Sequence, residues 1–96
     1  MKDTIYLTIL FDYYEKLLNE KDRNCFKLYY FDNLSLSEIS ENLDISRNAI
    51  HKRLKKTEED LLFYEKAIGL YNKEQKILSI IEDENTKEKI QKILNS

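Results

Sequence analysis

The sequence of 96 residues contains no proline, no tryptophan, one glycine, one cysteine and one methionine. The shortage of glycine and proline excludes collagen-like chains and flexible linkers, and it leaves the turns to Asn, Asp and Ser. We therefore expect long helices in one small domain. Because Cys25 has no second cysteine to pair with, the sequence excludes an internal disulfide and a cysteine-rich zinc site, which fits a reducing cytoplasm.

Membrane and catalytic signals are also missing. No apolar run approaches the roughly 20 residues that span a bilayer, and the N-terminal stretch has Asp3 and Asp12 but no small-residue cleavage site of a signal peptide. There is no glycine-rich phosphate loop, no nucleophile elbow and no His/Cys or Ser/His/Asp set with useful spacing. We expect no catalytic residue, no metal, no cofactor and no membrane insertion, and we predict that the protein is not an enzyme.

The net charge of −2 hides an uneven distribution. Residues 47–56 hold five basic residues and no acidic one, whereas residues 34–46 hold three acidic residues and no basic one. A short positive segment inside a slightly acidic chain is a candidate contact for phosphates. A basic run is also the ordinary solvated face of an amphipathic helix, so the charge pattern alone does not decide between the two interpretations.

Hydrophobic periodicity predicts an all-α chain. The first four expected helices cover about residues 4–18, 20–32, 35–43 and 46–69. The lone Gly69 is expected to end the fourth helix in the left-handed conformation. Beyond it the pattern weakens: we expect a fifth helix over about residues 70–81, an interruption at Asp83–Thr86 and a short final helix near residues 90–94.

The first expected helix is apolar over an arc of about 200°, twice the width that one packing contact needs. Such a helix contacts two surfaces, the second belonging either to its own bundle or to a second subunit. Residues 5–18 and 69–81 are the candidate surfaces of a homodimer. The helical spacing of the seven tyrosines indicates core positions before it indicates stacking on bases.

Residues 35–56 have the pattern of a helix-turn-helix. Ser35 and Glu38 have the spacing of a capping box, which begins a short helix. Residues 42–45 form a compact turn, and Ser46 caps a second helix, whose N-terminal residues reach base edges in such motifs. The apolar residues with the spacing to pack the two helices together are Leu36, Ile39, Leu43, Ile45, Ile50 and Leu54.

The candidate DNA contacts are the polar residues that project away from this apolar seam: Ser46, Arg47, Asn48, His51, Lys52 and Lys55. Arg47 suits guanine and Asn48 suits adenine in the major groove, while Ser46 and the N–H groups behind it suit a phosphate. Arg53 and Lys56 are placed for phosphate contact or for packing along the helix flank. His51 is expected to be a polar surface residue, because no second histidine could complete a metal site. The acidic residues 58–60 are expected to form a solvated face.

The segment LSLSEISENLDISRNAIHKRLKKTEEDL resembles the helix-turn-helix in region 4 of bacterial sigma factors. Together with FDYYEKLL, KDRNCFKLYYFDNLSLSEIS and TEEDLLFYEKAIGL, it resembles the YlxM family of small bacterial proteins over about residues 5–75. The resemblance implies an all-helical, dimeric, DNA-binding protein with a long recognition helix. Its helix-turn-helix domain would cover residues 1–75, with residues 76–96 as a C-terminal helical extension.

Two further features belong to this resemblance. The turn position that often holds glycine in such motifs is Asp44 here, and aspartate tolerates the left-handed conformation better than most residues. Members of the family are commonly encoded beside the signal recognition particle GTPase, which implies a cytoplasmic and regulatory role in that secretion pathway.

Three functional interpretations remain open. The first is a transcription regulator that binds duplex DNA as a homodimer. The second is an accessory factor that uses the same basic face on RNA or protein of the signal recognition particle, and the net charge of −2 fits this interpretation somewhat better than it fits strong DNA binding. The third is a structural dimer whose helix-turn-helix binds no nucleic acid.

Overall fold

The computed structural model describes residues 3–96, which form six α-helices and one 3-10 turn and contain no β-strand. These elements are α1 (Thr4–Tyr14), η1 (Glu15–Leu17), α2 (Glu20–Tyr30), α3 (Leu36–Leu43), α4 (Arg47–Ile68), α5 (Leu70–Ser79) and α6 (Glu84–Leu94). The predicted all-α class is therefore confirmed. The molecule is elongated, with extents of 49 × 24 × 24 Å.

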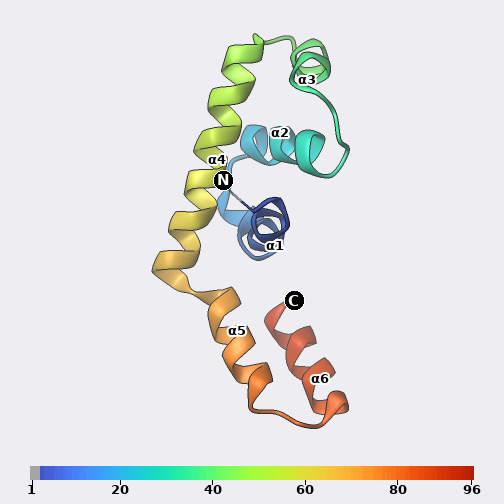
Figure 1. Cartoon of the computed structure of the whole chain (residues 1–96), viewed down its shortest axis with the longest axis vertical. Helices are drawn as coiled ribbons and strands as arrows, with labels where there is room; N and C mark the ends of the chain where they lie inside the picture. The colour runs from blue at the N-terminus through green and yellow to red at the C-terminus, as the bar shows by residue number, and fades with distance from the viewer. Residues whose placement is uncertain (1–2) are drawn as a thin grey trace.

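Helix α4 is the longest element, and all of the preceding α-helices pack against it. Figure 1 shows α1, α2 and α3 on the same side of α4, with α3 beside its N-terminal end. Helix α5 follows the C-terminal end of α4, and α6 turns back beside α5 so that the chain ends near α1. This arrangement separates the α3–α4 end of the molecule from the α5–α6 end.

The apolar core has two parts along α4. The first consists of Leu7, Leu10, Phe11, Tyr14, Leu18, Phe26 and Leu61. The second consists of Cys25, Ile39, Ile50 and Leu54. The stacked rings of Phe11 and Phe26, with centroids 4.6 Å apart, join α1 to α2 in the first part. Cys25 is buried, and so are Ile50 and Leu54, which the sequence predicted to pack α4 against the preceding helix.

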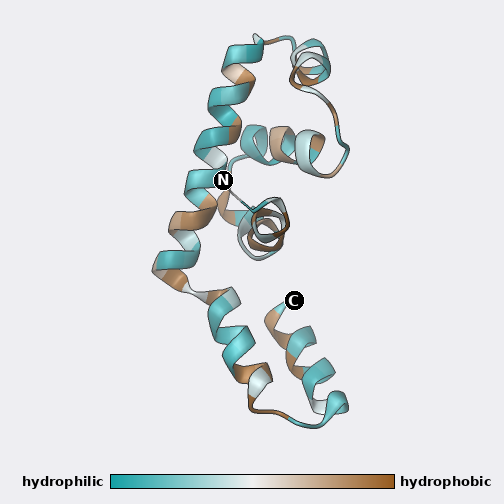
Figure 2. Cartoon of the chain, in the orientation of Figure 1, coloured by the Kyte–Doolittle hydropathy of each residue, from teal (hydrophilic) through white to brown (hydrophobic). Residues whose placement is uncertain are grey.

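The broad apolar arc of the first helix packs mainly against other helices of the same chain. One side of it enters the first core cluster. On another side, Tyr6 and Tyr13 both make edge-to-face contacts with Tyr71 of α5, with ring centroids 5.8 and 5.9 Å apart. Its second packing surface thus includes α5 of the same chain, whereas Ile5 remains 71% exposed. Figure 2 shows that α1 is largely apolar, whereas the N-terminal half of α4 is more hydrophilic.

The junction between α4 and α5 is held by side chains from α1 and α4. Gly69 has a φ of 71°, as predicted for a left-handed cap. The Glu65 carboxylate accepts hydrogen bonds from two backbone N–H groups in the first turn of α5, both at 3.1 Å. The Tyr14 hydroxyl donates to Glu65 at 2.6 Å and accepts from the N–H of Leu70 at 2.9 Å. These bonds satisfy N–H groups that a helix start leaves open, and they fix the direction of α5.

Several helix boundaries differ from the predicted ones. The first helix becomes a 3-10 turn after Tyr14, the second ends at Tyr30 and the fifth ends at Ser79. The predicted interruption at Asp83–Thr86 is wrong in its position, because Asp83 is the N-cap of α6 and its carboxylate accepts the N–H of Thr86 at 3.0 Å. An aspartate with an N–H donor three residues later begins a helix rather than breaking one, so the last helix is longer than predicted.

Candidate nucleic-acid interface

Helix α3 and the turn after it follow from local sequence rules. The Ser35 hydroxyl accepts from the N–H of Glu38 at 3.1 Å, and the Glu38 carboxylate accepts from the N–H of Ser35 at 2.9 Å, so the predicted capping box is confirmed. Hydrogen bonds from the backbone N–H and from the side chain of Ser35 to the Glu38 carboxylate lower the pKa of this carboxyl. Asp44 closes the helix with a φ of 55°, as expected for the position that often holds glycine.

The N-terminal end of α4 is held outward by the turn and by the core beneath it. The Ser46 hydroxyl accepts from the N–H of Ala49 at 3.1 Å, which confirms the predicted N-cap. Beneath this turn Ile39 of α3 and Ile50 of α4 are both fully buried. The first turn of α4 is therefore both capped and packed, and its polar side chains face solvent.

Six candidate contacts share the exposed surface of the N-terminal half of α4: Ser46, Arg47, Asn48, His51, Lys52 and Lys55. Arg47, Lys52 and Lys55 make no ion pair with any residue of the described range 3–96. Their charges are thus available to an external anion. A shallow hollow of about 320 Å³ lies between this face and α2, and His51, Lys55 and Tyr29 are among the residues that line it.

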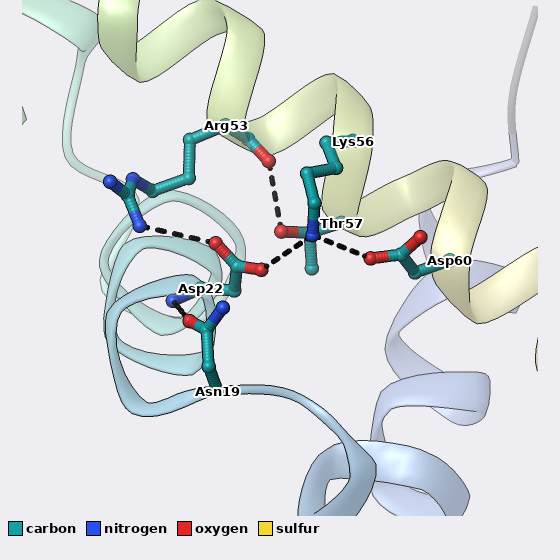
Figure 3. A network of polar contacts seen from close by, with 6 residues as sticks. All are labelled: Asn19, Asp22, Arg53, Lys56, Thr57 and Asp60. Atoms are coloured by element: carbon teal, nitrogen blue, oxygen red, sulfur yellow. Dashed lines mark hydrogen bonds and ion pairs between the residues drawn. The ribbon is translucent and has the colours of Figure 1, made fainter.

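Arg53 and Lys56 lie on a different flank of α4 and face the buried carboxylate of Asp22 on α2. Arg53 Nη1 lies 3.2 Å from one Asp22 oxygen and Lys56 Nζ lies 3.1 Å from the other, as Figure 3 shows. Lys56 also binds Asp60 at 2.9 Å, and the hydrogen bonds to Asp60 and Asp22 raise the pKa of the Lys56 ammonium. The two bases that the sequence placed for phosphate contact or for flank packing therefore fasten α4 to α2.

The acidic residues 58–60 do not form the simple solvated face that was expected, because two of them bind other side chains. Asp60 belongs to the ion-pair network, and the Glu58 carboxylate accepts a hydrogen bond from the Tyr30 hydroxyl at 2.5 Å. Burial and the bond to Glu58 raise the pKa of Tyr30. Of the three acidic residues only Glu59 is fully exposed. The correction has a physical reason: α2 crosses α4 here and brings its own polar groups within reach.

Sequence reasoning missed Asp22 and Tyr30 as residues that position α4. Asp22 has the local signal of a helix start, and its N–H does donate to Asn19 at 2.8 Å (Figure 3). Its second role depends on Arg53 and Lys56, which are 31 and 34 residues further along the chain. No local pattern carries that information.

Across residues 3–96 there is no group of three or more His, Cys, Asp or Glu residues that could hold a metal ion. Within the same residues no helix combines the length and apolar character needed to cross a bilayer.

The chain is similar in sequence to known proteins of one family. A sequence profile described as "Putative helix-turn-helix protein, YlxM / p13 like", that of the UPF0122 family, matches residues 1–96. A UPF0122 protein from Caldanaerobacter subterraneus subsp. tengcongensis is 45% identical over 80 residues, which cover 83% of this chain and 68% of the relative. One from Halalkalibacterium halodurans is 42% identical, covering 82% of this chain and 72% of the relative. A third, from Oceanobacillus iheyensis, is 37% identical and covers 94% and 92% respectively.

Proposed function

Because the chain belongs to the UPF0122 family of YlxM/p13-like helix-turn-helix proteins, we propose that it is a regulatory protein that binds duplex DNA through α4. One observation carries the proposal: the N-terminal half of α4 presents Arg47, Lys52 and Lys55 without ion-pair partners among the described residues, on a helix fixed by a core beneath it. A rigid helix with free cations on its outer face suits the major groove, which admits one α-helix.

In the proposed complex, α3 crosses the DNA backbone and the first turns of α4 enter the major groove. Arg47 and Asn48 read base edges, for which their bidentate donor and acceptor groups are suited. Ser46 and the N–H groups at the helix start bind a phosphate, and Lys52 and Lys55 neutralise phosphates alongside. Arg53 and Lys56 position α4 through Asp22 instead of contacting the DNA.

The proposal includes a homodimer. One recognition helix contacts few base pairs, so useful affinity needs two copies at half-sites about one helical turn apart, roughly 34 Å. The exposed side chains of Ile80 and Ile93 at the α5–α6 end are candidates for the dimer surface, together with Ile5 on α1.

A second candidate function is that of an accessory factor which binds RNA or protein of the signal recognition particle. The observation in its favour is electrostatic. Two of the five bases in residues 47–56 are occupied by Asp22, and the whole chain carries a net charge of −2. Duplex DNA binding usually comes with a basic domain, whereas a small basic patch is sufficient for an acidic protein surface or a short RNA segment.

Selection of bound sequences from random duplex DNA, followed by affinity measurements at several salt concentrations, tests the first candidate. Arg47→Ala should weaken binding to the selected site by about 1–3 kcal/mol and relax the base preference. Lys55→Ala should weaken binding to all sequences alike and reduce the salt slope by about one per copy. Lys76→Ala, on the exposed surface of α5, is the control for loss of one positive charge.

Unchanged affinity in both α4 variants at low salt would reject DNA reading by this helix. The accessory-factor candidate is tested with the same proteins, by co-elution with the particle's RNA and with its GTPase at physiological salt. Co-elution that Arg47→Ala and Lys55→Ala abolish, together with weak and unselective duplex binding, would favour the second candidate.

A further inference from the structure

A second hollow, of about 460 Å³, lies at the opposite end of the molecule from the α3–α4 unit, between α1, α5 and α6. The lining residues that matter here are Asp12, Tyr13, Tyr71, Glu74, Gln91 and Asn95. Two of these side chains are acidic, and among the described residues no lysine or arginine lines the hollow. Its polar groups therefore favour a positively charged occupant.

Glu74 is the most unusual residue of this hollow. It is only 3% exposed, and its Oε1 atom is buried without a hydrogen-bond partner among the described residues. Buried carboxylates in folded proteins almost always have a hydrogen-bond or ionic partner, because an isolated buried charge costs several kcal/mol. An unmatched acceptor beside a hollow is therefore a group with which a bound donor could form a hydrogen bond.

Two further features narrow the chemistry of that donor. The rings of Tyr13 and Tyr71 meet edge to face with centroids 5.9 Å apart, and aromatic faces attract organic cations. Desolvation and the nearby charge of Glu15 raise the pKa of the Asp12 carboxyl. Asp12 also makes no ion pair with a basic side chain among the described residues. The described residues hold no set of three or more metal-ligating side chains, which makes a divalent metal the poorer fit.

We propose that the hollow between α1, α5 and α6 binds an organic primary ammonium group. Glu74 and Asp12 supply the opposite charge, Tyr13 and Tyr71 supply aromatic faces, and the side-chain amide oxygens of Gln91 and Asn95 accept the remaining N–H groups. Such an ammonium group belongs either to a free amine or to a lysine side chain of another protein. The site lies outside the α4 surface and does not depend on DNA binding.

The test uses the full chain and two probes, n-butylammonium and Nα-acetyl-lysine amide, followed by amide chemical shifts and by the melting temperature. Saturable shifts are expected at Tyr13, Tyr71, Glu74 and Gln91, with a rise in melting temperature that equal concentrations of potassium do not produce. Glu74→Gln keeps the shape of the side chain and should weaken binding by about tenfold or more, since a hydrogen bond to a charged group is worth roughly 1.5–3 kcal/mol. Glu82→Gln, in the exposed α5–α6 loop, is the matched control and should bind normally.

Asp12→Asn provides a second variant at the more exposed rim, so the test does not depend on the folding of one mutant. Tighter binding of a free polyamine such as spermidine than of the lysine probe would support the site and identify a soluble amine as its occupant. The reverse order would support the site and identify a protein lysine. Absence of saturable shifts in the natural chain, or equal binding by Glu74→Gln, would overturn the proposal.

Discussion

The two ends of this molecule are stabilised in different ways. At the α3–α4 end, four buried residues form an apolar cluster, and an ion-pair network fastens α4 to α2. At the α5–α6 end, over residues 70–96, Glu74 is the buried side chain and the large apolar residues Ile80 and Ile93 are 81% and 73% exposed. The first end has the core that a fixed binding surface requires. The second end has little core of its own and leaves large apolar side chains in contact with solvent.

The comparison also separates two uses of charge. On α4, Arg53 and Lys56 both pair with Asp22, and Lys56 also pairs with Asp60, whereas Arg47, Lys52 and Lys55 are exposed on a helix that is held in place. On α5 the buried Oε1 atom of Glu74 has no hydrogen-bond partner among the described residues. The chain itself therefore satisfies the polar groups that position α4, and it leaves one buried oxygen of α5 without a partner.

The largest difference between the ends should appear when one apolar side chain is truncated in each. Ile50→Ala removes a fully buried side chain beside α3 and should cost about 2–4 kcal/mol of unfolding free energy. Ile90→Ala removes a half-buried side chain on α6 and should cost less than about 1 kcal/mol. Urea unfolding followed by circular dichroism measures both, and equal losses would show that α6 is packed as firmly as α4.

Removal of the charge that fastens α4 to α2 should have the next largest effect. Asp22→Asn keeps the shape of a buried side chain but loses two ion pairs, and we expect a loss of about 1–3 kcal/mol because both cationic partners remain partly hydrated. The exposed Asp32→Asn is the control and should stay within about 0.5 kcal/mol of the natural chain. The same urea titration measures both variants. Identical unfolding midpoints for Asp22→Asn and Asp32→Asn would show that the ion-pair network does not stabilise the fold.

At the α4–α5 junction, Tyr14→Phe removes the hydroxyl that joins Glu65 to the start of α5 and should cost about 1–2 kcal/mol. Burial and the hydrogen bond to Glu65 raise the pKa of Tyr14 to about 12. An unfolded tyrosine ionises near pH 10, so its contribution is complete below that pH and is lost as the pH rises toward 12, by up to about 1.4 kcal/mol per unit.

Unfolding measured at pH 9, 10 and 11 should therefore show a shallower decline for Tyr14→Phe than for the natural chain. Tyr30 also has a raised pKa and is present in both proteins, so the difference between the two curves isolates Tyr14. Parallel curves would contradict the assigned role of Tyr14.

The smallest effect concerns the carboxylates that begin α3 and α6. Hydrogen bonds to Ser35 lower the pKa of Glu38, and hydrogen bonds to Thr86 lower the pKa of Asp83. Both caps should be complete above the ordinary carboxyl pKa near 4 and should weaken as the pH falls through the lowered values. Amide exchange at the N–H groups of Ser35 and Thr86, which these carboxylates accept, follows each cap, and acid should open α6 first because α6 has no buried residue. Opening of α3 before α6 would contradict the expectation that the α3–α4 end is the more stable of the two ends.

Local rules made most of the helices and the exposed site predictable. Serine at a helix start, the spacing of Ser35 and Glu38 and the single glycine at position 69 fixed the caps of α3 and α4, since capping depends on residues within one turn. The exposure of Arg47 and Lys52 follows from their helical spacing relative to Ile50. The start of α6 was misplaced because Asp83 was interpreted as a helix breaker when its side chain caps the next helix.

By itself, the sequence determined that the chain is helical, where α4 begins and which side chains share its outer face, because these depend on periodicity and on neighbours along the chain. The tertiary structure alone decided which charges are satisfied. The partners of Asp22 are 31 and 34 residues away, and the partner of the Tyr14 hydroxyl is 51 residues away. Such pairs depend on how the helices cross, and a pattern along one helix defines its face without defining what lies opposite that face.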